Sequence, residues 1–431
     1  MAARFSAATQ WRCWAKRSWT KLMTMAARFN AASAQPSGKP RWPLHMDAVD
    51  PRHASCRPDF LVISAPKTGS TWLAVNLGRH PDIFVSEPKE LKYFDAYCQW
   101  FGLNWYFDQF WKGQQQIKGE ASPTYTLLPV PAIRALRALL PDLKLIYLMR
   151  DPVARAWSHA RHSCRFREAN FAAYQGDLGS VTDEQWRDNF THDWTLANGD
   201  YLGHLRRWLT VFPRQQVHIG FYESIVREPE VLMRQLFGFL GVNPDVDFGD
   251  FPVRDTIMQG LELEMKADHR QFLQTILGER NRELVTYFKE QLNLVPPPEW
   301  GETLQSGSVA RAPGSGPPGP AAASLASSLA KATQVFRRAW DSDYLTEVLD
   351  MDPLAELHVA HEGYKGYKIV HYRRQFYALG QSLGRVESHQ LLDERWLVEQ
   401  QGRGLCLLAR SPAEARERID QMIRPARPTG R

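Results

Sequence analysis

The sequence lacks any long hydrophobic segment: no stretch of its 431 residues approaches the roughly 20 apolar residues that are needed to span a bilayer. The basic N-terminus also lacks the apolar core of about 7–15 residues that a secretory signal peptide requires. The five cysteines are odd in number and scattered, without Cys-x-x-Cys spacing, which argues against a disulfide framework and a zinc site. These absences predict a cytoplasmic protein in a reducing compartment.

Net charge is scarce outside the N-terminus. The chain carries +6, but residues 1–60 alone hold ten Lys or Arg against three Asp, so the remainder is close to neutral. A nearly neutral body lacks the basic stripe of a nucleic-acid-binding fold, and we expect no nucleic-acid partner. With 44% hydrophobic and 12% aromatic residues, the chain is suited to a packed globular core.

The N-terminal segment, residues 1–57, has a composition of its own. Three tryptophans alternate with Arg and Lys between residues 11 and 21, which is typical of a helix that lies on an anionic membrane surface. The alternative is a disordered extension, or one that precedes the true start of the protein. We favour this alternative and keep weak contact with a membrane surface as the second interpretation.

Residues 58–295 alternate between strand-like and helix-like patterns, which is typical of an α/β fold with a parallel sheet covered by helices on both faces. The expected strands are residues 60–63, 83–85, 143–149 and 217–221. The expected helices are residues 71–77, 131–140, 153–166, 201–211, 228–240 and about 261–292. This part of the chain is therefore predicted to form the main domain.

Residues 296–330 are rich in Pro, Gly, Ser and Ala and have almost no large apolar side chains, which predicts a flexible linker. Beyond it, residues 331–431 alternate like a hairpin over residues 363–379 and end in a charged helical pattern over residues 412–423. We therefore expect a small accessory α+β module whose role the sequence does not identify.

The segment Pro66-Lys-Thr-Gly-Ser-Thr71 has the chemistry of an anion-binding loop. An apolar strand precedes it and an amphipathic helix follows, so that backbone amides and the positive end of the helix dipole converge on one point. Gly69 allows close approach of a phosphate, and Lys67 adds a positive charge. The Walker order Gly-x-x-x-x-Gly-Lys-[Ser/Thr] is not present, because Lys67 precedes Gly69 and the first glycine is missing.

A second motif for anion binding follows the apolar run 145–149. Arg150 stands at the end of this run, before Asp151 and Pro152, and the helical pattern that follows carries Ser158. Ligands of open α/β sheets bind at the carboxyl ends of the strands, so we expect Arg150 to reach the crevice that contains Lys67. An arginine can hold a phosphate with two hydrogen bonds, and a serine hydroxyl adds a further donor.

Together the two motifs resemble those of sulfotransferases that use 3′-phosphoadenosine 5′-phosphosulfate (PAPS): the first resembles their 5′-phosphosulfate-binding loop, and the second their 3′-phosphate-binding motif. The resemblance covers about residues 58–295. It implies a three-layer, P-loop-like fold, PAPS as the sulfuryl donor, and no metal. The residues that it assigns to the donor are Lys67, Thr68, Gly69, Ser70, Thr71, Trp72, Arg150 and Ser158.

The resemblance also implies the catalytic residues. In the glycan-directed branch, which includes heparan sulfate N- and 3-O-sulfotransferases, a glutamate precedes a His-Phe-Phe-Asp-like run, and Glu90 stands at that place here. Glu90 is then the general base, with Glu87 as its rival, and Lys67 stabilises the leaving phosphate. A glutamate base favours a carbohydrate-type acceptor, a glycan or a glycolipid.

One position departs from the branch. Its members often carry a lysine in a Glu-Lys-[Ser/Thr]-Pro segment, where this chain has Ala121. Either Lys118 or Lys92 compensates, or the acceptor is less negatively charged than heparan sulfate.

The function predicted is in-line transfer of a sulfuryl group from PAPS to a carbohydrate hydroxyl or amine. The alternatives are a kinase, which would need the Walker order, and a non-catalytic nucleotide-binding scaffold or interaction protein that kept the fold.

Overall fold

The structure is a computed structural model. It describes residues 49–87, 89–98, 102–165, 178–257, 260, 262–301, 303, 320–350, 358–364, 367–372, 375–383, 394–409 and 412–423. Both interpretations of the N-terminal segment therefore concern residues that lie almost wholly outside the described part. The last residues of the N-terminal segment form a short 3-10 helix, η1 (Pro51–Cys56), in which Cys56 is buried in the main hydrophobic core.

The core of the main domain is a parallel sheet of five strands in the order β2-β3-β1-β4-β5. The strands are β1 (Phe60–Val62), β2 (Ile83–Val85), β3 (Ile117–Ala121), β4 (Lys144–Met149) and β5 (Val217–Phe221). The first strand lies at the centre, between β3 and β4, so the segments that leave β1 and β4 emerge side by side at the carboxyl edge. This confirms the predicted α/β fold.

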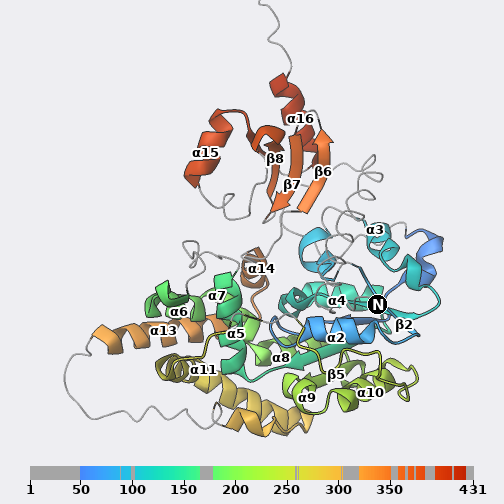
Figure 1. The fold of residues 1–431 in the computed structure, drawn as a ribbon, viewed down its shortest axis with the longest axis vertical. Coiled ribbons are helices and arrows are strands. Elements are labelled where there is room, and N and C mark those ends of the chain that lie inside the picture. The colour runs from blue at the N-terminus through green and yellow to red at the C-terminus, as the bar shows by residue number, and fades with distance from the viewer. Residues whose placement is uncertain are drawn as a thin grey trace, which may run out of the picture.

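Alternating side chains of the central strands enter two separate cores. Phe60 and Val62 pack with one hydrophobic cluster, while Leu61 and Ile63 pack with another. Helices α2 (Ser70–Leu77) and α10 (Pro229–Leu240) contribute to the first cluster, and α4 (Val130–Leu139) and α8 (Tyr201–Val211) contribute to the second. Because successive residues of a strand point to opposite faces, the sheet forms the middle of three layers (Figure 1).

The remaining helices of the main domain include several that the sequence did not indicate. The sequence indicated α5 (Pro152–Arg165) and α11 (Ala267–Tyr287), and it did not indicate α3 (Leu103–Asp108), α6 (Asp183–Phe190), α7 (Asp193–Gly199) and α9 (Tyr222–Arg227). Short 3-10 and π turns complete it: η2 (Tyr93–Tyr97), η3 (Trp111–Gly113), η4 (Pro123–Leu127), η6 (Leu178–Ser180), η7 (Arg214–Gln216), η8 (Phe288–Leu292) and η9 (Pro298–Trp300). The predicted helix over about 261–292 is thus α11 extended by η8.

The predicted linker differs from the structure in its second half. Helix α13 (Pro320–Arg337) begins inside it, and α14 (Ser342–Asp350) follows. Val335, Leu345 and Val348 are buried in one hydrophobic cluster with residues of α5 and α11, and Figure 1 shows α13 beside α11. The alanine-rich sequence that suggested a linker forms a helix, since alanine has the highest helix propensity.

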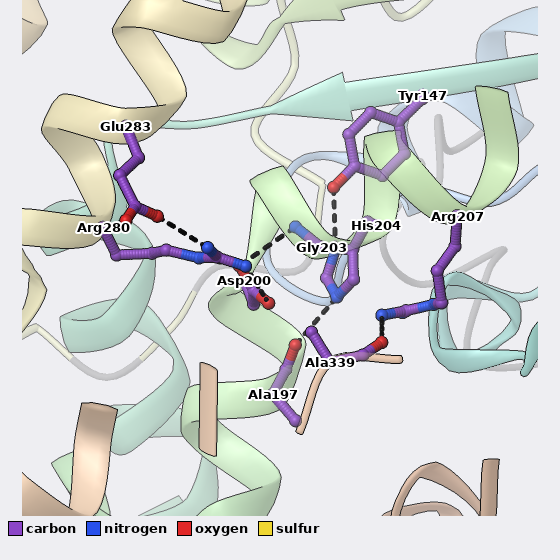
Figure 2. Close-up of polar contacts among 9 residues, drawn as sticks. All are labelled: Tyr147, Ala197, Asp200, Gly203, His204, Arg207, Arg280, Glu283 and Ala339. Carbon is purple, nitrogen blue, oxygen red and sulfur yellow. Dashed lines mark hydrogen bonds and ion pairs between the residues drawn. The ribbon is translucent and has the colours of Figure 1, made fainter. Parts of the chain in front are cut away.

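Two arginines of the main domain, the buried Arg207 and the half-buried Arg280, contact these C-terminal helices, and Figure 2 shows both residues. Arg207 of α8 donates to the carbonyl oxygens of Ala339, in the turn before α14, and of Thr126. The guanidinium carbon of Arg280 in α11 lies 5.5 Å from the centre of the Phe336 ring in α13, and the same guanidinium is held by two hydrogen bonds, of 2.7 and 2.9 Å, to the Asp200 carboxylate at the start of α8. Residues 320–350 are therefore part of the folded main domain.

We expect a chain that ends at residue 295 to lose cooperative folding. It would expose the surface covered by Val335, Tyr344, Leu345 and Val348, and fully burying such a side chain contributes about 1.5–3 kcal/mol. Four such side chains sum to about 6–12 kcal/mol, which is comparable to the whole stability of a typical domain. A chain that ends at residue 350 should keep a sharp thermal transition by circular dichroism. Matching transitions for both chains would contradict this assignment.

The C-terminal module is a small antiparallel sheet with a helix packed on it (Figure 1). Its elements are β6 (His358–Tyr364), β7 (Tyr367–Tyr372), β8 (Gln375–Gly380), η10 (Gln381–Leu383), α15 (Glu394–Gly402), β9 (Cys406–Ala409) and α16 (Pro412–Ile423). Ile369, Ala378 and Ile419 form its small core. The predicted α+β class is correct for this module, and within the described chain no helix has the length and hydrophobicity to cross a bilayer.

Candidate functional site

The loop after β1 has the conformation expected of an anion-binding turn. Lys67 and Gly69 both have positive φ, of 74° and 93°, and Gly69 caps α2 without any side-chain hydrogen bond. The first helical hydrogen bond runs from Leu73 N to Gly69 O at 2.9 Å, so the amides before Leu73 have no acceptor within the helix. The N-terminus of α2 therefore offers several backbone donors to an anion.

Arg150, at the end of β4, is held by its backbone. Tyr201 Oη donates to Arg150 O at 3.0 Å and accepts from Arg150 N at 3.2 Å. The next amide, Asp151 N, donates to Glu223 Oε1 at 2.9 Å, and the Asp151 carboxylate accepts from Ala154 N at the start of α5. The strand end is thus anchored, while the guanidinium of Arg150 remains half-exposed.

Tyr222 brings the two motifs into one place. The guanidinium carbon of Arg150 lies 4.4 Å from the centre of the Tyr222 ring, a cation–π distance. A methyl group added to Gly69 would come within 3.2 Å of the same ring. Gly69 and Arg150 therefore lie beside the same side chain, which brings the two predicted anion-binding motifs close together at the carboxyl edge of the sheet.

The charge of Lys67 is affected by its neighbours. Burial, together with repulsion from Arg150, Lys89 and Arg161, lowers the pKa of Lys67 to about 8, while Glu90 opposes the shift. His162 Nδ1 lies 3.2 Å from Lys67 Nζ. So many cations around one ammonium favour a bound anion, which would offset their mutual repulsion.

We expect adenosine 3′,5′-bisphosphate to bind more weakly as pH rises through 8. A bound phosphate favours protonated Lys67, which is already charged below its pKa of about 8. Affinity should therefore be level from pH 7 to 8 and then fall by up to about tenfold per pH unit, because binding must be accompanied by proton uptake. Isothermal titration calorimetry in buffers of different ionisation enthalpy measures both effects.

Lys67→Arg is the control for this pH dependence. Its guanidinium stays protonated over the whole range, so the decline above pH 8 should disappear even if affinity is lower overall. A parent protein whose affinity is unchanged between pH 7 and 9.5 would show that the Lys67 ammonium does not contact the nucleotide.

Glu90 lies close enough to these cations to interact with them. Its carboxylate forms an ion pair with Lys89, and 37% of its side chain is exposed. Burial acts to raise the pKa of Glu90, but Lys89, Lys92 and His162 together lower it below its ordinary value. Glu90 is therefore ionised at neutral pH, the form that can accept a proton. Its rival Glu87 is exposed.

Backbone strain is concentrated at this site. Among the described residues, four non-glycines have positive φ, and three of them are Lys67, Glu90 and Lys92. Such conformations cost of order 1–3 kcal/mol each and occur frequently at functional sites.

One face of helix α5 is turned toward the Lys67 loop. Ser158, Arg161 and His162 are half-buried and follow one another at helical spacings of three and four, so they share a face. His162 contacts Lys67, which identifies this face as the one turned toward the loop. Ser158 therefore lies on the helix face where the sequence predicted a hydroxyl that donates a hydrogen bond to a phosphate.

Two of the predicted donor-binding side chains also serve the fold. Thr68 Oγ1 donates to Ala65 O at 2.7 Å within the turn. Trp72 is buried, and its Nε1 donates to Val253 O at 3.1 Å. These contacts leave the backbone amides of the loop as its main donors, together with the half-buried Thr71 and the Ser70 hydroxyl at the helix start.

The structure decides which lysine could stand in for the one missing at Ala121. Lys118 lies near the start of β3, where its ammonium pairs with Asp59 at 2.9 Å. It is thus directed away from the carboxyl edge of the sheet. Lys92 is buried and acts on the charge of Glu90, so only Lys92 remains as a substitute.

His162, Arg161 and Lys89 are the site residues that the sequence did not identify. His162 and Arg161 stand four and three residues after Ser158, so helical spacing from Ser158 could have indicated both. Lys89 precedes Glu90 directly, and a Lys-Glu pair in a loop has no signal that distinguishes it from a solvated turn.

Comparison with known proteins agrees with these motifs. A family model described as "Sulfotransferase domain" matches residues 57–272. A membrane-associated sulfotransferase, kil1, of Dictyostelium discoideum is 26% identical over 310 aligned residues, and the match covers 53% of this chain and 64% of that protein. Human bifunctional heparan sulfate N-deacetylase/N-sulfotransferase 2 is 30% identical over 203 residues, with 44% of this chain and 23% of that protein covered.

A sulfotransferase from Alicyclobacillus acidocaldarius is a similar solved structure. It is 23% identical, with a TM-score of 0.40, and the match covers 57% of this chain and 99% of the other. The chain spans less than two thirds of the length of both curated relatives. The prediction of a cytoplasmic protein is wrong by this comparison, since the Dictyostelium relative is membrane-associated.

Proposed function

The chain belongs to the sulfotransferase family, and from this premise we propose that it transfers a sulfuryl group from PAPS to a hydroxyl or amine of a carbohydrate-type acceptor. The observation that carries the proposal is that Gly69 and Arg150 lie beside the same tyrosine ring. A doubly phosphorylated nucleotide needs two anion sites within the length of one molecule, and this arrangement supplies them.

The donor has a place for each of its anionic ends. The amides at the start of α2 and the Lys67 ammonium would hold the 5′-phosphosulfate, because both are donors at the positive end of a helix. Arg150 and Ser158 would hold the 3′-phosphate, since Arg150 follows β4 directly and Ser158 lies on the face of α5 that is turned toward the Lys67 loop.

Glu90 is suited to accept the proton of the acceptor. In the proposed step, the acceptor oxygen or nitrogen forms a bond to sulfur while the bond from sulfur to the 5′-phosphate oxygen breaks. The acceptor proton passes to the Glu90 carboxylate, and adenosine 3′,5′-bisphosphate leaves. Negative charge grows on the leaving phosphate oxygen, where Lys67 and the loop amides stabilise it.

A carbohydrate acceptor is supported by the relatives. Several are named as heparan sulfate N-deacetylase/N-sulfotransferases, and the family model covers residues 57–272, which include Glu90. With Ala121 at the position of a lysine, the site has one cation fewer at that position to attract an anionic acceptor. We therefore expect glycans or glycolipids with fewer sulfate groups than mature heparan sulfate to be better substrates.

The proposal is tested with ³⁵S-labelled PAPS and a glycan panel. The panel includes N-deacetylated heparosan, which offers free amines, and its N-acetylated parent, which offers only hydroxyls. Label in the first glycan alone indicates N-sulfation, and label in both indicates O-sulfation. Retention of adenosine 3′,5′-bisphosphate without transfer to any glycan would favour a nucleotide-binding scaffold and overturn the enzymatic proposal.

A further inference from the structure

Four consecutive backbone amides, starting at Glu90, donate hydrogen bonds to one short segment at the end of β3. The pairs are Glu90 N to Ala121 O at 3.1 Å, Leu91 N to Glu120 Oε2 at 3.2 Å, Lys92 N to Ser122 Oγ at 3.2 Å, and Tyr93 N to Tyr125 Oη at 2.8 Å. The first acceptor belongs to the backbone, and the other three are side chains. The Glu90 loop is thus held amide by amide, mainly by side chains.

Glu120 is the centre of this network and has no exposed surface. Besides the Leu91 amide, three hydroxyls donate to its carboxylate: Ser122 Oγ at 2.6 Å, Tyr106 Oη at 2.8 Å and Tyr125 Oη at 2.8 Å. Four donors match the capacity of an ionised carboxylate. Burial raises the pKa of Glu120 to about 7, although the three hydroxyls act to lower it.

The direction of these hydrogen bonds lets Glu120 act on the Glu90 loop indirectly, through the hydroxyls of Ser122 and Tyr125. A hydroxyl that donates its hydrogen to the carboxylate presents its lone pairs to other donors. Ser122 and Tyr125 are oriented in this way, and each accepts a loop amide. The Glu120 carboxylate orients the two hydroxyls, and the hydroxyls hold the backbone amides of Lys92 and Tyr93, just after Glu90.

The loop requires such support because two of its residues are strained. Glu90 and Lys92 have φ of 67° and 49°, and each such residue costs of order 1–3 kcal/mol. A buried network of satisfied hydrogen bonds can maintain this conformation. If one acceptor were lost, the loop could relax toward negative φ, and the carboxylate of Glu90 would move away from Lys67 and His162.

We propose that Tyr125, Ser122 and Glu120 are positioning residues, which fix the strained loop so that the Glu90 carboxylate lies beside the reacting atoms. The inference rests on the proposed function, in which Glu90 is the base. It adds a set of buried groups that contact neither PAPS nor the carbohydrate acceptor and yet determine the turnover rate.

Tyr125→Phe tests the inference, with Tyr106→Phe as its matched control. Both hydroxyls donate to Glu120 Oε1 at 2.8 Å and both side chains are buried, but only the Tyr125 hydroxyl accepts from the Tyr93 amide. We expect Tyr125→Phe to lower kcat by about 100-fold, the effect of a misplacement of about 1 Å. Affinity for adenosine 3′,5′-bisphosphate should stay within about twofold of the parent, and Tyr106→Phe should keep most of the activity.

Hydrogen exchange of the amides at residues 91–93 provides a readout besides activity. Exchange should be faster in Tyr125→Phe and unchanged in Tyr106→Phe, with thermal unfolding as the check that both variants are folded. Ser122→Ala is the second variant, should Tyr125→Phe not fold, and it should expose the Lys92 amide.

The outcomes separate the two proposals. A parent protein that transfers no sulfate to any glycan overturns the proposed function. An active parent whose two Tyr→Phe variants have the same kcat overturns the positioning role alone, as does equal amide exchange in the two variants.

Discussion

Lys67→Ala is expected to reduce the affinity for adenosine 3′,5′-bisphosphate by about 100-fold or more and to abolish measurable sulfate transfer. The Lys67 ammonium is mostly buried and is surrounded by Arg150, Arg161 and Lys89, so the site is prepared for an anion at this point. Truncating one partner of a buried charge pair costs about 2–5 kcal/mol, and here the same group would also stabilise the leaving phosphate. Calorimetry and the labelled-PAPS assay measure the two losses separately.

Arg150→Ala should weaken binding to a similar extent, and Arg137→Ala is its matched control. Arg150 and Arg137 are both half-buried, and each guanidinium lies over an aromatic ring, at 4.4 Å from Tyr222 and 5.4 Å from Phe212. Arg137 belongs to α4 and donates to Val211 O, so its loss should leave nucleotide affinity unchanged. Equal losses from the two variants would indicate a general effect on folding. Full nucleotide affinity in Arg150→Ala would refute the proposal that Lys67 and Arg150 bind the two anionic ends of one nucleotide.

The strands that the sequence predicts best are those with a continuous apolar run. The runs at β1 and β4 are continuous and apolar, as expected of strands buried on both faces, and the structure confirms both. The strand β3 reads Ile-Lys-Gly-Glu-Ala and gave no such signal. Its two charged residues are buried because partners far along the chain satisfy them: Asp59 for Lys118, and Tyr106 for Glu120.

The candidate site residues that could be predicted are those that belong to a short, continuous sequence motif. Lys67 follows β1 after a short turn and Arg150 follows β4 directly, so parallel-sheet geometry alone brings them to one edge. The conformation of the Glu90 loop was not predictable, because positive φ at a non-glycine residue is unfavourable locally. It is maintained by residues about 30 positions further along, such as Ser122 and Tyr125, and a sequence pattern does not indicate which hydroxyl will accept which amide.

Glu90→Gln is expected to lower kcat by about 100-fold or more while nucleotide affinity stays close to that of the parent. Glutamine has nearly the same shape but cannot accept a proton, and general base catalysis contributes about 10²–10⁴-fold. Glu87→Gln is the matched control, because Glu87 lies three residues earlier and is exposed; it should retain activity. A fully active Glu90→Gln protein would assign the base to another group.

The pH profile of turnover gives a second test of the same carboxylate. Burial raises the pKa of Glu90, but Lys89, Lys92 and His162 outweigh it and hold the pKa below the ordinary glutamate value. A base with a lowered pKa is active above that pKa and loses activity as pH falls through it, so Glu90 should impose no acid limb on kcat between pH 5 and 8. Lys89→Gln removes the ion pair and the strongest lowering influence, and the acid limb should then move upward. An acid limb that stays in place would mean that the proton of the acceptor does not pass to Glu90.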